Sequence, residues 1–401
     1  MMKKNALIGL ALMVLLSLTA HAQKLNTGPW RFEFKTTHAV IPVIINFKQV
    51  QHKMEGEIQN GKEKIPLKEV FLDNGKIIIP VQDYELTLEL KKISEVLLTG
   101  EFIRHNKNPK KIIPVQAFFN QKERFPQPKM DPSIKLTGKW EVTLTDEESK
   151  ESKGIVLFEQ KGQKLSGTIM TPTGDYRYFD GYVSGTTFEA ASFDGGYNYL
   201  LKGEVKNKVL KASILSNTVT KLVGKFNPKA ELPDAYKQTE LPSLNFSFPD
   251  LTGRLVSLHD KKFKNKPVIV QFFGSWCPNC MDEMNFLIKW YNMNRHKKDV
   301  EIIALAFERS LDQSEARRQL VKVKENKAVP YYLLQAGSTA EDKPMDKITG
   351  LKNFISFPTT VFLNRKHEVV KVHAGFTGPS TGTYFTKWKE EFNETVNQIS
   401  R

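Results

Sequence analysis

The stretch FGSWCPNC, residues 273–280, decides the fold of the second half of this chain. It continues the apolar run PVIVQFF of residues 267–273, which is typical of a strand buried on both faces of a sheet. Beyond it, apolar residues recur at helical spacing and basic residues close the segment, which predicts a helix over 276–298. The two cysteines are therefore expected where a buried strand ends and a helix begins.

Cys277 and Cys280 are the 2 cysteines of a chain of 401 residues. They cannot staple distant segments, and closing so short a loop removes little entropy from the unfolded chain, so local chemistry is the better interpretation. A helix N-terminus carries partial positive charge and free N–H groups, which stabilise a thiolate at Cys277. Because Cys280 lies one turn deeper, we predict that Cys277 attacks a disulfide and Cys280 resolves the mixed disulfide.

A zinc half-site is one rival interpretation of this cysteine pair, and an inert pair is another. A structural zinc ion needs four ligands, and the sequence offers no second Cys or His pair at ligand spacing. We therefore expect a redox-active pair that uses neither a metal nor an organic cofactor.

The residues after the helix continue the alternation of strands and helices. The pattern predicts a strand, an amphipathic helix, a second strand, a hairpin and a final helix, at residues 300–307, 311–325, 331–335, 359–373 and 384–399. Such alternation implies an α/β sheet whose parallel strands are joined by right-handed crossovers.

These features together resemble a known family. Residues 241–401 look like a thioredoxin fold, and within it like the exported TlpA-like (ResA-like) thiol-disulfide oxidoreductases, because Trp276 directly precedes the first cysteine. The resemblance implies that Trp276 flanks the site, although plain packing is the alternative role for this ring. It also implies that Pro278 and Asn279, between the cysteines, flank the site and tune the reduction potential.

The resemblance further assigns an acid and a proline loop. Glu283 matches a family glutamate that tunes the cysteine pair, with a solvated acid of the first helical turn as the alternative. Phe357, Pro358 and Thr359 match the family's cis-proline loop, which faces the cysteines and leaves a backbone edge free for an extended substrate. Gln271 stands where thioredoxin has a buried acid, which shifts proton transfer to Glu283 or to water.

Residues 24–227 have a different pattern, in which apolar and polar residues alternate and turn signals interrupt the alternation, so this region is predicted to be all-β. The pattern also repeats. GPWRFEF at residues 28–34 aligns with GKWEVTL at residues 138–144, and a second match follows at almost the same spacing. Two copies of one β module are therefore expected.

Each copy resembles a small lipocalin-like barrel or sandwich. The first copy is expected at residues 23–125 and the second at residues 133–228, separated by proline-containing linkers that suit stiff connections. Trp30 and Trp140 are expected to plug the two cores rather than to contact a ligand, because buried tryptophan is usually packing.

Residues 1–22 have the layout of a secretory signal. Lys3 and Lys4 precede an apolar run, and Ala20-His21-Ala22 offers small residues for cleavage. We therefore expect an exported protein of the periplasm or cell envelope, with an uncleaved anchor as the alternative. The net charge of +15 is spread along the chain, so we expect no nucleic-acid partner and at most peripheral membrane contact.

We predict an exported thiol-disulfide oxidoreductase, acting as a reductase of protein disulfides. Its partners would be disulfide-bearing or dithiol protein substrates and, as the resemblance implies, a membrane dithiol or disulfide donor. An oxidase or an isomerase stays open, because the direction depends on the reduction potential. A different class of function is a binding protein that acts through its N-terminal β modules, with the redox domain secondary. A peroxidase ranks last, because the residues before Cys277 lack the Pro and Thr usual in peroxiredoxins.

Overall fold

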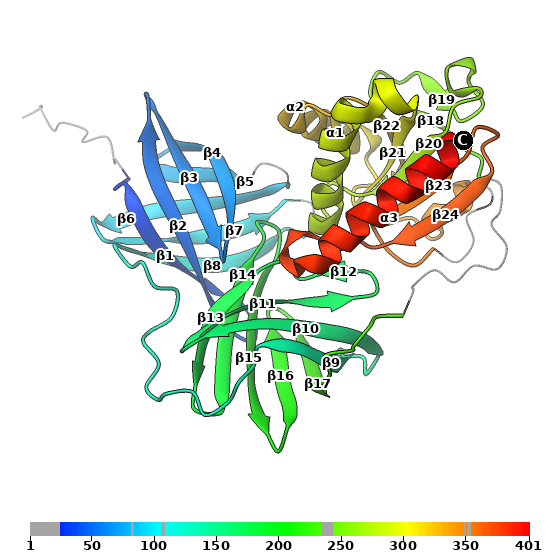
Figure 1. Ribbon diagram of the computed structural model, residues 1–401. Coiled ribbons are helices and arrows are strands. Elements are labelled where there is room, and N and C mark those ends of the chain that lie inside the picture. The colour runs from blue at the N-terminus through cyan, green and yellow to red at the C-terminus, as the bar shows by residue number, and fades with distance from the viewer. Residues whose placement is uncertain (1–24, 82–83, 106–108, 234–243, 349, 351–353) are drawn as a thin grey trace, which may run out of the picture.

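The computed structural model describes residues 25–81, 84–105, 109–233, 244–348, 350 and 354–401. The predicted signal peptide, residues 1–22, lies outside the described residues. Figure 1 shows three bodies around a common centre: a blue-to-cyan barrel, a green barrel and a yellow-to-red domain of helices and strands. We name them barrel 1, barrel 2 and the C-terminal domain.

Barrel 1 is a closed ring of antiparallel strands in chain order, because β1 pairs with both β2 and β8. Its strands are β1 Gly28–Lys35, β2 Val40–Val50, β3 Lys53–Asn60, β4 Glu63–Asp73, β5 Lys76–Val81, β6 Leu86–Ser94, β7 Leu97–Arg104 and β8 Lys111–Phe119. The inward-facing residues of β1 include Trp30, Phe32 and Phe34, all fully buried. Aromatic side chains therefore fill the interior of the barrel.

Barrel 2 closes in the same way, through the pairing of β10 with β11, and β12 adds a short extra strand beside β11. Its strands are β9 Gly138–Thr145, β10 Glu151–Lys161, β11 Lys164–Thr171, β12 Gly174–Asp175, β13 Phe179–Ser184, β14 Thr187–Phe193, β15 Asn198–Lys206, β16 Val209–Leu215 and β17 Val219–Phe226. The all-β fold predicted for this half of the chain is confirmed, and both copies are barrels.

The repeat seen in the sequence extends to detail. Trp30 Nε1 donates to the carbonyl oxygen of Asn26 at 2.9 Å, and Trp140 Nε1 donates to that of Leu136 at 2.8 Å. Both tryptophans are buried on the first strand of their barrel and bond four residues back. They are packing residues in both copies, as expected.

The C-terminal domain has a five-stranded sheet in the order β22-β21-β20-β23-β24, parallel except for the pairings made by β23. Its elements are β18 Ser247–Pro249, β19 Leu255–Ser257, η1 Lys261–Phe263, β20 Val268–Phe273, α1 Pro278–Lys298, β21 Glu301–Glu308, α2 Gln313–Lys327, β22 Tyr332–Ser338, η2 Pro344–Lys347, β23 Thr359–Leu363, β24 Val369–Ala374, η3 Pro379–Thr381 and α3 Thr383–Ser400. This is the predicted thioredoxin-like arrangement.

The central strand β20 is buried on both faces, as its apolar run predicts. Ile269 and Phe273 pack in one cluster with residues of all three helices, whereas Val268, Val270 and Phe272 pack on the opposite face with the β18–β19 hairpin. Among the described residues, no helix has the length and apolar character needed to span a membrane.

Helix α1 begins two residues later than its sequence pattern suggests. Cys277 is the N-cap, with extended backbone angles, and Pro278 takes the first helical position, where the missing N–H of proline costs nothing. The helix therefore starts directly at the cysteine pair. In Figure 1 the N-terminal end of α1 points toward barrel 2.

Candidate active site

The two cysteines form a disulfide across the first turn of α1, with their Cα atoms 5.2 Å apart. Cys277 Sγ also accepts a hydrogen bond from the backbone N–H of Cys280 at 3.3 Å. Cys277 is 6% exposed and Cys280 is fully buried. Cys277 is therefore the more exposed residue of the pair, and its sulfur lies where the free N–H groups of the helix point.

Trp276 closes one side of the disulfide. Its Nε1 donates to the carbonyl oxygen of Phe307 at 2.9 Å, and its ring meets that of Phe357 edge-on, with centroids 5.7 Å apart. The guanidinium carbon of Arg309 lies 4.5 Å from the centre of the Trp276 ring. The indole is thus held on three sides, which makes it a rigid wall beside Cys277.

The loop of Phe357, Pro358 and Thr359 faces the disulfide. The Phe357–Pro358 peptide bond is cis, and the carbonyl oxygen of Phe357 lies 3.7 Å from Cys277 Sγ. Thr359 is buried and donates from its hydroxyl to the carbonyl oxygen of Ser356 at 2.7 Å. The structure therefore brings this loop and the cysteine pair together.

Glu283 lies behind the disulfide and is fully buried, which excludes the solvated acid that was the alternative interpretation. It follows Cys280 by three residues, so both side chains lie on the same face of α1. Glu283 accepts hydrogen bonds from Gln271 Nε2 at 2.8 Å and from the Thr360 hydroxyl at 2.7 Å. Burial outweighs these two bonds and raises the pKa of Glu283 to about 7.

A second buried carboxyl group was not expected from the sequence. Glu308, the last residue of β21, accepts from the backbone N–H of Ser275 at 2.9 Å and from the Ser275 hydroxyl at 2.6 Å. Burial raises the pKa of Glu308 to about 7. The sequence signal for Glu308 was an acid directly after a buried apolar run. Acids at the end of a strand are often exposed, so this signal did not predict burial.

Barrel 2 covers the disulfide from the far side, which the sequence did not indicate. A cavity of about 240 Å³ separates it from the cysteine pair. The residues of barrel 2 that line this cavity are Thr171, Thr173, Gly174, Asp175, Tyr176, Asp194, Tyr197 and Tyr199, and those of the C-terminal domain are Trp276, Cys277, Pro278 and Asn279. The disulfide is therefore partly covered but not sealed.

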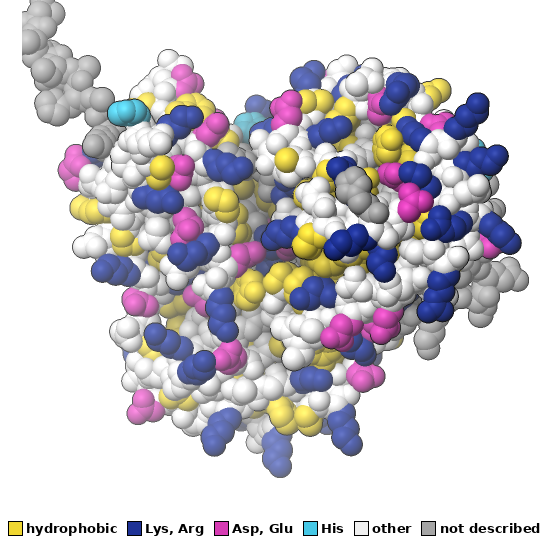
Figure 2. Space-filling model, turned by 45° about the horizontal axis from the view of Figure 1, so that its top comes forward, with side chains coloured by type: hydrophobic (Ala, Val, Ile, Leu, Met, Phe, Trp, Pro, Cys, Tyr) yellow, Lys and Arg dark blue, Asp and Glu magenta, His cyan; other side chains and the backbone are white. Residues whose placement is uncertain are grey.

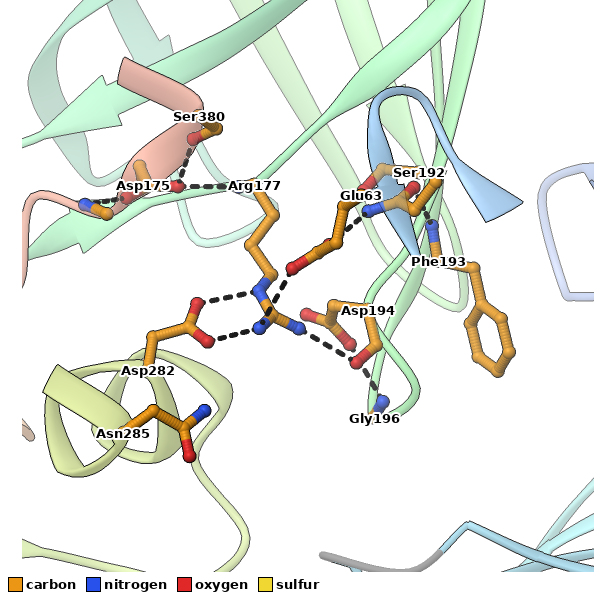
Figure 3. Close-up of polar contacts among 12 residues, drawn as sticks. Glu63, Asp175, Arg177, Ser192, Phe193, Asp194, Gly196, Asp282, Asn285 and Ser380 are labelled. Carbon is orange, nitrogen blue, oxygen red and sulfur yellow. Dashed lines mark hydrogen bonds and ion pairs between the residues drawn. The ribbon is translucent and has the colours of Figure 1, made fainter. Parts of the chain in front are cut away.

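Arg177 joins all three bodies beside this cavity (Figure 3). Its guanidinium forms a paired contact with the carboxylate of Asp282 on α1 and an ion pair with Glu63 of barrel 1 at 3.3 Å. It also donates to the carbonyl oxygen of Asp194 at 3.1 Å. Burial alone would lower the pKa of Arg177, but Asp282 and Glu63 outweigh it and hold this pKa well above the usual range.

A larger hollow of about 640 Å³ lies between the three bodies and does not include the cysteines. Figure 2 shows hollowed surface between the bodies with basic side chains around it. The lysines that line this hollow are Lys64, Lys68, Lys289 and Lys327. Among the described residues, no cluster of three or more His, Cys, Asp or Glu side chains could hold a metal ion.

The arrangement of strand, cysteine pair, helix and cis-proline loop defines the C-terminal domain as a thioredoxin-fold redox domain. Residues 237–384 match the family model described as Redoxin. The chain is 29% identical over 154 residues to the thiol-disulfide oxidoreductase ResA of Halalkalibacterium halodurans, a match that covers 38% of this chain and 74% of that protein. It is 28% identical over 159 residues to the sporulation thiol-disulfide oxidoreductase A of Bacillus subtilis, covering 39% and 83%.

Among solved structures, the chain is similar to a thiol:disulfide interchange protein of the thioredoxin family from Chlorobium tepidum. That similarity has 17% identity and a TM-score of 0.31, and it covers 41% of this chain and 100% of the other. The C-terminal domain is similar to the ResA-like thiol-disulfide oxidoreductases of the thioredoxin family, and the protein is an oxidoreductase. The two barrels lie outside the matched family model.

Proposed function

We propose that this protein reduces disulfide bonds in exported proteins through Cys277 and Cys280. One observation carries the proposal: Cys277 Sγ lies at the N-terminus of α1, 3.7 Å from the Phe357 carbonyl oxygen of the cis-proline loop. The sulfur proposed as the nucleophile thus lies beside a backbone edge on which an extended chain can lie. Similar proteins are named thiol-disulfide oxidoreductase ResA, which supports thiol-disulfide exchange as the chemistry.

The proposed cycle moves two electrons between sulfur atoms. In the reduced protein the Cys277 thiolate attacks one sulfur of a substrate disulfide, forms a mixed disulfide and releases the other substrate sulfur as a thiolate, which takes up a proton. Cys280 then loses its proton and attacks Cys277 Sγ. That step releases the second substrate thiol and leaves the Cys277–Cys280 disulfide seen in the structure.

Glu283 is the proposed acceptor for the Cys280 proton. A pKa of about 7 lets this carboxyl group take and return a proton near neutral pH. The side-chain amide of Gln271 suits both states of the acid, because it donates to the carboxylate from Nε2 and, after a flip, can accept from the protonated acid. Gln271 thus assists proton transfer without carrying a charge itself.

The site of action and the electron donor are also proposals. The signal-like residues 1–22 support export to the periplasm or cell envelope. Outside the cytosol, soluble reductants are scarce, so a membrane dithiol protein would return the Cys277–Cys280 disulfide to the dithiol form. Trp276, Pro278 and Asn279 would flank the reacting sulfur during both exchanges.

The test is disulfide reduction by the full chain with insulin as substrate and dithiothreitol as electron source. Cys277→Ala is expected to lose turnover, and Cys280→Ala to accumulate a mixed disulfide that is visible on a non-reducing gel. Met293→Ala, on an exposed part of the same helix, is the control and should keep wild-type turnover. Full turnover by folded Cys277→Ala protein would overturn the proposal.

The direction of electron flow is measured separately, by equilibrating the cysteine pair with glutathione or dithiothreitol buffers. A reduction potential of about −270 mV would support a reductase. A potential of about −120 mV would identify an oxidase, by comparison with the reduction potentials of known oxidoreductases.

A further inference from the structure

Two loops of barrel 2 lie directly on the disulfide region. The first is the segment of residues 172–178 between β11 and β13, which we call the connecting segment. At Gly375, just beyond β24, an added Cβ would lie 2.5 Å from the Thr173 backbone, and a Cβ added at Gly174 would lie even closer to the side chain of Asn279. The connecting segment therefore contacts both the cysteine motif and the loop that follows the cis-proline hairpin.

The second loop joins β14 to β15. Gly196 in this loop packs on the ring of Pro278, so closely that an added Cβ would lie 3.3 Å from Pro278 Cγ. Tyr197 accepts a hydrogen bond from Arg309 at 2.9 Å, and Arg309 covers the indole of Trp276. Barrel 2 thus contacts Pro278 and Asn279 directly, and it contacts Trp276 through Arg309.

The space left between barrel 2 and Cys277 has a distinctive wall. Tyr176, Tyr197 and Tyr199, which we call the tyrosine wall, line the same cavity as Trp276. Tyr197 and Tyr199 are stacked with an interplanar angle of 6°, and Tyr176 meets Tyr199 edge-on at 5.3 Å. At about 240 Å³ the cavity is smaller than the ~300–1,000 Å³ of ordinary small-molecule sites, so a folded domain has no room in it.

The connecting segment is held in place by two charged residues, which we call the latch. Asp175 is buried and accepts from the backbone N–H of Gly378 at 2.6 Å and from the Ser380 hydroxyl at 2.8 Å. Arg177 forms its paired contact with Asp282, which follows Cys280 by two residues on α1. Opening the latch would break the hydrogen bonds of Asp175 and the ion pair of Arg177, so these contacts favour the covered state.

We propose that barrel 2 forms the second wall of the substrate site, and that the tyrosine wall selects an extended cysteine-bearing segment with an aromatic neighbour over a disulfide on a folded surface. The inference rests on the proposed function and names its substrate class. An extended segment can lie along the Phe357 carbonyl edge with its sulfur at Cys277, while a flat side chain beside its cysteine stacks between the tyrosine wall and Trp276. The sulfur exchange itself is unchanged.

The first experiment compares one disulfide in two settings. A linear peptide with the sequence Tyr-Cys at its centre and a single-cysteine variant of folded ubiquitin are each joined to glutathione through a disulfide. We expect kcat/KM for the peptide to exceed that for ubiquitin by at least tenfold. In the latch variant, Asp175→Asn with Arg177→Gln, the ratio should fall at least fivefold. Equal kcat/KM for both substrates with the wild-type protein would overturn the proposal.

The second experiment tests the tyrosine wall with two peptides, one carrying Tyr-Cys and one carrying Ser-Cys. The wild-type protein should prefer the tyrosine peptide through a lower KM, and Tyr197→Ser should reduce that preference at least threefold. Tyr182→Ser is the matched control, because Tyr182 belongs to barrel 2 but packs against Phe125, away from the cavity. A wild-type protein without preference, or one whose preference survives Tyr197→Ser, contradicts the tyrosine wall.

A third measurement separates this inference from the proposed function. After reduction, labelling of Cys277 by N-ethylmaleimide and by a 5-kDa polyethylene glycol maleimide is followed by mass spectrometry and normalised to a free cysteine peptide. We expect the bulky reagent to be at least tenfold slower on the wild-type protein, and the gap to close in the latch variant. If no substrate is reduced but this gap is present, the proposed function fails and the covering role of barrel 2 stands. A wild-type protein without the gap overturns that role.

Discussion

Barrel 1 and barrel 2 are copies of one fold, yet only barrel 2 lines the cavity at the disulfide. In barrel 1 the strands β3 and β4 are joined by the tight turn of residues 61–62. In barrel 2 the equivalent connection is the segment of residues 172–178, which carries β12, Asp175 and Arg177. The barrel fold itself therefore acts as a scaffold. The longer connection of barrel 2 is the part that reaches the disulfide.

Barrel 1 contributes by holding barrel 2. The backbone N–H of Gly61 donates to Asp180 at 3.0 Å, and the N–H of Phe193 donates to the Asn60 side chain at 3.0 Å. Arg124, in the linker after barrel 1, is buried and donates to backbone carbonyls of both barrels. The short β3–β4 turn of barrel 1 therefore helps to hold barrel 2, whose longer connection between β11 and β13 lies at the site.

The largest expected effect comes from Arg177→Met, which tests whether the long connection is anchored by charge. The variant leaves Asp282 and Glu63 without their buried cation, so we expect a loss of about 3–5 kcal/mol in the free energy of unfolding. Chemical denaturation measures it. Arg31→Met, which removes the partner of Glu33 within barrel 1, is the control. A loss below that of the control would mean that the anchor is not electrostatic.

Glu283 lies beneath the end of α1 that barrel 2 covers, and it makes stability depend on pH. Its folded pKa of about 7 exceeds the ordinary 4.5, so the folded protein holds its proton longer than the unfolded chain. The stability due to this group is therefore fully present below pH 4.5 and is lost as the pH rises through about 7. Relative to Glu283→Gln, the oxidised wild-type protein should lose on the order of 3 kcal/mol across this window.

The measurement is the free energy of unfolding of both proteins between pH 4 and 8.5. Glu308 titrates in the same window, but it is present in both proteins, so the difference isolates Glu283. A flat difference between the two proteins would contradict a raised pKa at Glu283.

A smaller effect tests whether the two barrels are equivalent inside. Trp30→Phe and Trp140→Phe each remove an indole N–H bond to a carbonyl four residues back and leave a small cavity. We expect each variant to lose about 1–3 kcal/mol of unfolding free energy, with the two losses within about 1 kcal/mol of each other. Thermal and chemical unfolding of the full chain measure the losses. Losses that differ by more would show that the copies have diverged in their cores.

The smallest effect is expected at the exposed edge between the barrels. Lys62 lies 3.5 Å from Glu159, and both side chains are well exposed, so water and salt screen the pair. Lys62→Ala should change stability by less than about 1 kcal/mol, and disulfide reduction should stay unchanged. A larger loss would mean that the barrels depend on this surface contact as well as on the buried one at Arg124.

Much of the fold could be predicted because its signals are local. The period of two along the barrel strands, the paired Gly-x-Trp segments and the apolar run before Cys277 each act within a few residues. The burial of Glu283 could not be read from α1 alone, because it depends on Gln271 and Thr360 from two neighbouring strands. Residues 194–196, Asp-Gly-Gly, have the pattern of a turn, and such a pattern does not say which surface the turn meets.

The roles of the predicted site residues remain predictions, as do the limits placed on the domains. The structure adds the proximity of distant segments. Cys277, Phe357 and Trp276 lie around one point. Glu308 and barrel 2 lie beside them, although no local sequence pattern indicated this. Docking between distant segments depends on surface shape and on buried charge pairs, and neither has a period along the chain.

The position of Arg177 has a consequence for the motion of the whole molecule. Its guanidinium is bonded to barrel 1, to α1 and to its own barrel at once. Hinge motion between any two of the bodies would remove one partner of the buried Arg177 guanidinium. Small hinge motions are therefore disfavoured, and the bodies are expected to separate in a single cooperative step. Calorimetry should accordingly record a single unfolding peak for the three bodies, and two peaks once Arg177 is replaced.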